Sequence, residues 1–194
     1  MDFIKTSIKD IVLIKPKLLS DDRGYFVETF HKDKLETEIG YQLNFCQDNE
    51  SRSFKGVLRG LHFQLPPFAQ SKLVQVIKGE VLDIAVDIRT GSPTFGHHVA
   101  EHLNSHNKHQ LFIPRGFAHG FVVLSEYAIL SYKVDNFYSS KYESGLLFDD
   151  PCLGINWELP SNQLKLSEKD TLNRSLEELI NECSQFSYDK NLYE

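Results

Sequence analysis

The sequence predicts an all-β protein, a sandwich or barrel of short strands, for three reasons. Through the first three quarters of the 194 residues, short apolar or alternating runs are separated by turn residues. These runs are rich in Val, Ile, Phe and Tyr, which favour strands. Helical periodicity appears only twice and weakly, and many strands with little helix between them are typical of a sandwich or barrel.

The longest of these runs, residues 72–88, is expected to form two strands rather than one. We expect a hairpin that turns near Lys78–Gly79, because glycine supplies the positive φ that such turns need. In chain order, the expected strands lie at 11–19, 25–30, 56–65, 72–88, 109–114, 120–126 and 128–134.

Two short helices complete the expected elements. The first covers residues 31–39, and the second covers 175–183, with Ser175 as its cap and apolar residues at helical spacing. There is no internal repeat, low-complexity stretch or convincing linker. The sequence therefore predicts one domain over residues 1–172 and a helical tail, 173–194, packed on the same domain.

Composition narrows the function and the compartment. A formal net charge of −6 argues against a nucleic-acid binder. The three cysteines, Cys46, Cys152 and Cys183, are an odd number without short spacing, which favours a reducing compartment over a disulfide framework or a zinc site. No signal peptide precedes the first strand, and no stretch approaches the ~18 apolar residues of a membrane span. We expect a cytoplasmic protein.

Alternation within the strands places polar side chains on defined faces. In 80–88 the aliphatic residues at even positions share one face, while Asp83 and Asp87 lie on the other. Carboxylates on a sheet usually face water, and we expect that here. If the sandwich holds a ligand, however, the same face could line its pocket. Tyr132 and Tyr138 also share a face, provided that their strand runs unbroken.

Several classes of catalytic site lack their sequence signals. Five of the eight histidines fall between 97 and 109 at irregular spacing, which favours a solvated surface over a metal site. His62 has no His-x-His partner, and the cation of Lys72 would repel a divalent ion, so no catalytic metal and no cofactor are expected. A nucleophile elbow and phosphate-binding glycine motifs are absent. Acid–base chemistry by His, Lys, Tyr and Asp remains.

Seven motifs stand in the order and approximate spacing of one known family. They are DDRGYFVETF, QDNESRSFKGVLRGLHFQLPP, SKLVQVIKGEVLDIAVDIRTGSPTFG, IPRGFAHGFVVLSE, YKVDNFY, FDDPCLGINW and LSEKD. Over roughly residues 5–172 the chain resembles the dTDP-4-dehydrorhamnose 3,5-epimerase family. The resemblance implies a metal-free, cupin-like jelly roll, usually a homodimer, that acts on nucleotide-linked 4-keto-6-deoxyhexoses.

The implied reaction inverts the carbons that flank a ketone, through an enolate. It needs a base on one face, a donor or cation at the ketone oxygen and an acid on the opposite face. By the resemblance, His62 is the base, Asp170 orients it, Lys72 stabilises the enolate and Tyr132 returns the proton. Taken alone, His62 suggests a satisfied core histidine, Lys72 a strand-end lysine in solvent and Tyr132 a packing residue.

The resemblance also implies how the nucleotide sugar is bound. Arg59 contacts the diphosphate, with Arg23 and His119 nearby. The other implied binding residues are Phe26, Glu28, Gln47, Asn49, Lys72, Tyr138 and Glu143. In the family, the segment Arg23–Glu28 reaches the site of the partner subunit, so a homodimer is expected.

One conflict arises inside the motif GVLRGLHFQL at 56–65. Arg59 and His62 are three residues apart, so an uninterrupted strand would point them to opposite faces. The proposed site needs both in one pocket. Gly60 resolves the conflict if it marks a bulge that shifts the alternation, and we predict irregular strand geometry there.

Alternatives to the double epimerase stay open at this point. One is a relative with narrower chemistry: a C3-only epimerase, a ketoisomerase, or an enzyme of a GDP- or CDP-linked sugar. Another is a sugar-binding module without catalysis, which the complete set of four catalytic candidates argues against. A metal-dependent oxygenase is a third, opposed by the missing ligand pair.

Overall fold

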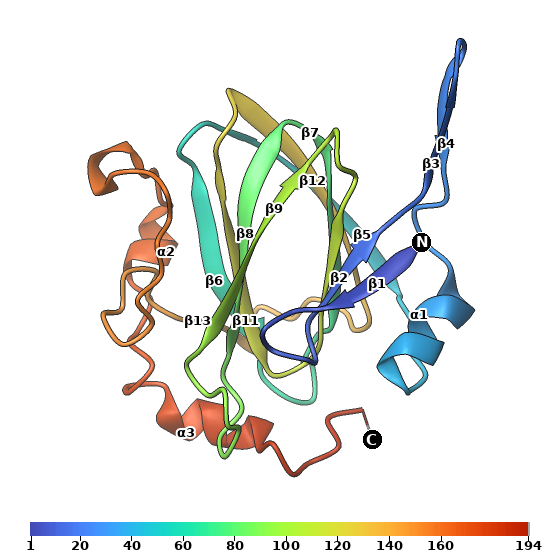
Figure 1. The fold of residues 1–194 in the computed structure, drawn as a ribbon. Coiled ribbons are helices and arrows are strands. Elements are labelled where there is room, and N and C mark those ends of the chain that lie inside the picture. Colours follow the sequence, from blue (N-terminus) through green and yellow to red (C-terminus); the bar gives the residue numbers. More distant parts are fainter. Residues whose placement is uncertain (194) are drawn as a thin grey trace.

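Two antiparallel sheets face each other in the computed structural model, which describes residues 1–193 (Figure 1). The six-stranded sheet has the order β1 (Asp2–Lys5), β2 (Val12–Lys15), β10 (Gln110–Ile113), β7 (Lys72–Lys78), β12 (Tyr127–Val134) and β5 (Gln47–Phe54). The five-stranded sheet has the order β13 (Glu143–Gly145), β6 (Leu58–Gln64), β11 (Phe117–Val123), β8 (Glu80–Asp87) and β9 (His98–Asn104). This arrangement confirms the predicted all-β sandwich.

The strands bury apolar residues on both faces of each sheet. Val74 of β7, Val81 of β8 and Leu111 of β10 belong to the core between the sheets. Helix α1 (Lys32–Ile39) covers the outer face of the six-stranded sheet through Leu35. Chain beyond residue 150 covers the outer face of the five-stranded sheet, where Trp157 joins the cluster of the even-numbered β8 residues. Because both faces of β8 are covered, Asp83 and Asp87 are fully buried, and the expectation that they face water is wrong.

The expected hairpin at Lys78–Gly79 is also wrong, although the turn itself is present. Gly79 has a φ of 81°, and a Cβ there would meet the carbonyl oxygen of Tyr127 at 2.1 Å. The strands on either side, β7 and β8, belong to opposite sheets and do not pair. The turn carries the chain from one layer to the other, since the apolar faces of both strands meet in the core between the sheets.

The remaining elements are short. The predicted first helix is confirmed as α1, while the second begins later than expected, as α3 (Ile180–Cys183). Ser175 instead caps a turn, because its Oγ accepts from the Glu178 N–H at 3.3 Å. The others are the hairpin of β3 (Leu18–Asp21) and β4 (Gly24–Val27), α2 (Glu168–Thr171) and two 3-10 turns, Ser161–Gln163 and Ser184–Phe186.

Two further observations concern the ends of elements. Strand β12 stops at Val134, so Tyr132 and Tyr138 do not lie on one unbroken strand, as the alternation had suggested. The β3–β4 hairpin projects away from the sandwich, as Figure 1 shows. None of the helices in the described chain has the length and apolar content that crossing a bilayer requires.

Candidate active site

A cavity of about 500 Å³ opens at one edge of the sandwich. Its walls come from β5, β7 and β12 of one sheet, β6 and β11 of the other, and the segment 165–170, which runs alongside β6. Six of the expected site residues line it: Arg59, His62, Lys72, His119, Tyr132 and Asp170.

A bulge brings Arg59 and His62 into this cavity together. On β11, His119 pairs with His62 and Phe121 pairs with Arg59, so two steps on β11 oppose three on β6. Gly60 lies in the extra step with a φ of 135°, and a Cβ there would meet the Cα of Gly120 at 2.5 Å. The predicted irregularity at Gly60 is therefore confirmed, and only glycine fits this position without displacing the neighbouring strand.

The side chain of His62 is hydrogen-bonded to Asp170, a residue of helix α2. The distance from Nε2 to Oδ1 is 2.5 Å. Asp170 is buried and sits in α2, where the Ser167 side chain caps its backbone N–H. Burial raises the pKa of Asp170, but the hydrogen bond and charge of His62, the Ser167 hydrogen bond and the charge of Lys169 together outweigh it, and the pKa lies below its usual value. A carboxylate thus orients the imidazole and leaves Nδ1 as its second functional atom.

Lys72 is the first residue of β7 and projects into the protein rather than into solvent. Its Nζ donates to the carbonyl oxygen of His62 at 3.4 Å. Burial lowers the pKa of Lys72 to about 8, although the negative charges of Asp83 and Glu143 oppose the shift. Lys72 is therefore not the solvated strand-end lysine that the residue taken alone had suggested. A desolvated ammonium next to the imidazole is suited to stabilise an oxyanion.

Tyr132 supplies a phenol from the six-stranded sheet, which also carries Lys72 and lies opposite the sheet of His62. It lies on β12, pairs with Asn49 of β5 and is half-buried. Burial raises the pKa of Tyr132, while the charge of Arg59 partly opposes that shift. The phenol therefore stays protonated through the neutral range and can donate its proton.

A second histidine–carboxylate pair lies on the neighbouring strands, with His119 on β11 and Asp83 on β8. Nε2 of His119 is 2.9 Å from Oδ2 of Asp83, and both side chains are buried. Burial lowers the pKa of His119, although Asp83 opposes this. Strand alternation had placed Asp83 on this face, but its partner was not foreseen.

Four other expected binding residues contact one another beside the cavity. The Tyr138 hydroxyl donates to Glu143 Oε2 at 2.6 Å, and Lys169 Nζ lies 2.5 Å from the same oxygen. Gln47 Nε2 donates to Asn49 Oδ1 at 2.8 Å, and the Tyr138 N–H donates to Gln47 Oε1 at 3.2 Å. Glu143 and His62 share an adjoining hollow, so this cluster is continuous with the main cavity.

Three expected binding residues are not brought to the cavity by their own chain. Arg23 and Phe26 belong to the projecting β3–β4 hairpin, and Glu28 follows it. Arg23 is paired with Asp21 of the same hairpin, and Phe26 is 68% exposed.

Two lysines that line the cavity were not among the residues predicted from the sequence. Lys165 and Lys169 both line the cavity. Lys169 was present in the motif LSEKD but was not singled out there. Lys165 has neither an ion-pair nor a hydrogen-bond partner for its side chain within residues 1–193. Together with Arg59 and Lys72, they make the cavity suitable for a ligand that carries several negative charges.

Known proteins resemble this chain in sequence and in fold. The family model described as dTDP-4-dehydrorhamnose 3,5-epimerase matches residues 5–178. A dTDP-4-dehydrorhamnose 3,5-epimerase of Shigella flexneri is 51% identical over 170 residues, 88% of this chain and 93% of that one. A dTDP-4-dehydrorhamnose 3-epimerase of Streptomyces niveus is 34% identical over 165 residues, 85% of this chain and 80% of that one.

A solved structure extends the likeness to a ligand complex. The dTDP-6-deoxy-D-glucose-3,5-epimerase of Legionella pneumophila, in complex with dTDP-4-keto-L-rhamnose, aligns with a TM-score of 0.91 at 44% identity. The alignment covers 98% of this chain and 99% of that one.

Proposed function

The chain belongs to the dTDP-4-dehydrorhamnose 3,5-epimerase family, and we propose that the residues of this cavity carry out the double epimerisation. The enzyme converts dTDP-4-dehydro-6-deoxyglucose to dTDP-4-dehydrorhamnose by inverting C3 and C5. One observation carries the assignment of roles: the His62–Asp170 pair, Lys72 and Tyr132 meet in a single cavity from both sheets.

His62 begins each inversion as the base. Asp170 accepts the hydrogen bond from Nε2, so the lone pair of Nδ1 is free to take the proton next to the ketone. The C–H electron pair moves into a carbon–carbon double bond, and the ketone oxygen becomes an enolate oxygen. The negative charge of Asp170 then stabilises the imidazolium that has formed, as in other histidine–aspartate pairs.

Lys72 and Tyr132 complete the reaction. The Lys72 ammonium stabilises the enolate oxygen, and removal of such a donor typically costs ~10²–10³ in turnover. Tyr132 then donates its proton to the carbon from the face opposite His62, which inverts the centre. Before the second inversion the His62 imidazolium releases its proton to solvent and the Tyr132 phenolate takes one up from solvent. The hydroxyl is a weak acid, but an enolate carbon is a strong enough base to accept from it.

The cations of the cavity bind the diphosphate, and the mouth binds the nucleobase. Arg59 contacts the phosphates, with His119 nearby, and Lys169 adds charge. Tyr138 stacks on the base, while Gln47, Asn49 and Glu143 provide hydrogen bonds. The polar cluster that these side chains form beside the cavity supports this division.

A homodimer completes each site. The exposed aromatic ring of Phe26 and the projecting hairpin support the view that Arg23, Phe26 and Glu28 enter the cavity of the partner subunit. We place the enzyme in the cytoplasm, because Cys46 and Cys152 are exposed free thiols, which suits a reducing compartment.

Solvent exchange tests the function directly. The enzyme is given dTDP-4-dehydro-6-deoxyglucose in deuterated water, with the GDP-linked sugar in parallel, and NMR locates the deuterium. Deuterium at both C3 and C5 of the dTDP sugar is expected. Deuterium at C3 alone would favour the 3-epimerase activity named for the Streptomyces niveus relative. Exchange at neither carbon overturns the proposal.

A further inference from the structure

The end of the chain crosses the sandwich where β7 and β11 begin and β12 ends. We call residues 187–193 the strap. The N–H of Tyr188 donates to the carbonyl oxygen of Thr90 at 2.9 Å, next to β8. Near its end, the Leu192 carbonyl accepts from Arg115 Nη1 at 2.8 Å, in the turn before β11. The strap lies beyond the residues 5–178 that match the family.

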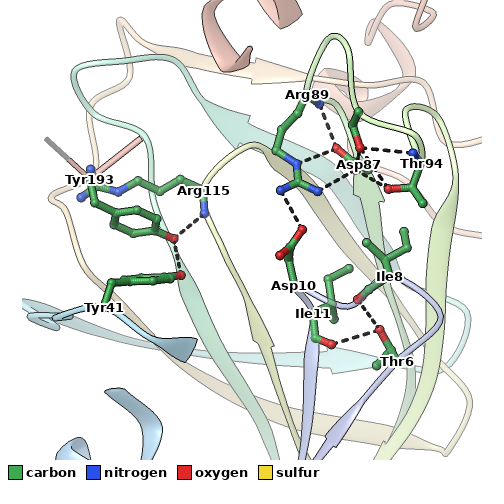
Figure 2. Close-up of polar contacts among 11 residues, drawn as sticks. Thr6, Ile8, Asp10, Ile11, Tyr41, Asp87, Arg89, Thr94, Arg115 and Tyr193 are labelled. Carbon is green, nitrogen blue, oxygen red and sulfur yellow. Dashed lines mark hydrogen bonds and ion pairs between the residues drawn. The ribbon is translucent and has the colours of Figure 1, made fainter. Parts of the chain in front are cut away.

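Tyr193 is the centre of the contacts that the strap makes. Its hydroxyl oxygen is 2.8 Å from the Tyr41 hydroxyl and 2.8 Å from Ser71 Oγ. It also accepts from the Arg115 backbone N–H at 3.1 Å, and Figure 2 shows the contacts with Tyr41 and Arg115. The Arg115 guanidinium lies over the Tyr193 ring, 4.9 Å from its centroid.

Asp135 joins the same contacts from the end of β12. Its Oδ1 accepts from the Ser71 N–H at 2.6 Å, and its Oδ2 accepts from Arg115 Nε at 3.1 Å. Ser71 is fully buried, and only 3% of the Asp135 side chain is exposed. We refer to Tyr41, Ser71, Arg115, Asp135 and Tyr193 as the Tyr193 network.

The Tyr193 network holds three neighbouring strand ends, and each of these leads to a residue of the cavity. Ser71 directly precedes Lys72, Asp135 follows Tyr132 by three positions, and Arg115 precedes His119 by four. The register places the start of β7 between the ends of β12 and β10, because Lys72 lies opposite Val134 on one side and Ile113 on the other; Arg115 lies in the turn that joins β10 to β11. The Ser71 side chain contacts the Tyr193 hydroxyl, while the side chain of the next residue, Lys72, lines the cavity.

We propose that Tyr193 is a positioning residue for the epimerase: through Ser71 it fixes the start of β7 and so holds the Lys72 ammonium in place. The inference rests on the role of Lys72 in the proposed function. A phenylalanine at 193 would keep the ring but remove the contact to Ser71 Oγ and leave the Arg115 backbone N–H without its acceptor. The start of β7 would then loosen, and water would reach Lys72.

The expected effect is on turnover rather than on binding. A displacement of about 1 Å can cost ~10²-fold in rate, and a partial loosening should cost about tenfold in kcat. KM should stay within about twofold, because the diphosphate contacts at Arg59 are unchanged. Hydration of Lys72 should also raise its pKa, which moves the alkaline limb of the pH–rate profile to higher pH.

The test compares two full-length variants that differ only in which hydroxyl is lost. Tyr193→Phe removes the hydroxyl of the network. Tyr188→Phe removes a hydroxyl of the same strap that makes no hydrogen bond within residues 1–193. Ser71→Ala breaks the same contact from the other side and replaces Tyr193→Phe if that protein fails to fold. The titratable groups that face Lys72, which all variants retain, are His62, Asp83, His119 and Glu143.

Two measurements then decide the matter. The first is kcat, KM and the alkaline limb with dTDP-4-dehydro-6-deoxyglucose. The second is an NMR titration of the Lys72 side chain, which does not require turnover and so separates this inference from the proposed function. We expect a reduced kcat and a raised Lys72 pKa in Tyr193→Phe, with Tyr188→Phe like the parent. A parental Lys72 titration in folded Tyr193→Phe, or in Ser71→Ala, overturns the proposal.

Discussion

Replacement of Lys72 by methionine should make the protein more stable and much less active. Lys72 is the first residue of β7, and its side chain lines the cavity. Burial lowers the pKa of this side chain from 10.5 to about 8. Between these two pH values the unfolded chain binds more protons than the folded one, so stability rises with pH over this range. At neutral pH the full difference opposes folding, and each pH unit corresponds to 1.36 kcal/mol.

The size of the stability effect follows from this pKa. The difference between 10.5 and about 8 corresponds to an upper limit of about 3 kcal/mol in the free energy of unfolding. Methionine has a similar length and no charge, so Lys72→Met should gain a substantial part of this at pH 7. Loss of the enolate-stabilising cation should lower kcat by ~10²–10³. In the parent enzyme, activity should fall about tenfold per pH unit above pH 8, as the ammonium is lost.

Urea denaturation at pH 7 and pH 10 measures the first effect, and initial rates from pH 6 to 10 measure the second. Non-enzymatic change of the keto sugar at high pH is subtracted from enzyme-free samples. The stability gain should shrink at pH 10, where the parent lysine is largely neutral in the fold and losing its charge in the unfolded chain. A Lys72→Met protein that is destabilised at pH 7, or that turns over within threefold of the parent, would refute the reasoning.

Three further predictions address other parts of the site. Asp170→Asn should lower kcat/KM by about 10–10²-fold, because a hydrogen bond to a charged group is worth about 1.5–3 kcal/mol; parental steady-state kinetics would contradict the His62–Asp170 pairing. Lys165→Gln should raise KM a few-fold at low salt and lose that effect at 0.5–1 M salt, as expected of a rim charge, whereas the exposed Lys55 outside the cavity should tolerate the same change. Mixing inactive His62→Ala and Phe26→Ala subunits should restore activity if each site takes its hairpin from the partner, and no recovery after exchange would argue against the shared site.

The strand pattern was readable because alternation is a local property. It located strands such as β6, β8 and β12 and assigned the two faces of β8, but the expected strand 11–19 splits into parts of β2 and β3, and no signal marked β5. The spacing of Arg59 and His62 predicted the bulge at Gly60 only in combination with the single pocket that the family resemblance implies. The strand pattern did not reveal that Gly79 joins opposite sheets, because a turn residue fixes the direction of the chain but not the partner of the next strand. Hence the burial of Asp83 was misjudged.

The contacts of the chain end had no signal in the sequence. Tyr41 and Tyr193 are 152 residues apart, and their pairing depends on how the strap crosses the completed sandwich. The helical pattern at 175–183 favoured a longer helix than the one that forms, because turns capped by Ser175 carry the chain onto the five-stranded sheet. Catalytic roles could be proposed only through the family motifs, since a histidine or lysine in an apolar run usually has a structural role.

The bulge at Gly60 also sets a length. Arg59 contacts the diphosphate and His62 the sugar in the proposed site, so the spacing between their side chains must match the spacing between the phosphates and the ketone of the substrate. One extra residue on β6 produces that match, and the close approach of Gly60 to Gly120 keeps the two strands in the required register. If both contacts form as proposed, backbone geometry contributes to the choice of substrate as well as side-chain chemistry: a sugar with its ketone at another ring carbon could satisfy one of these residues but not both.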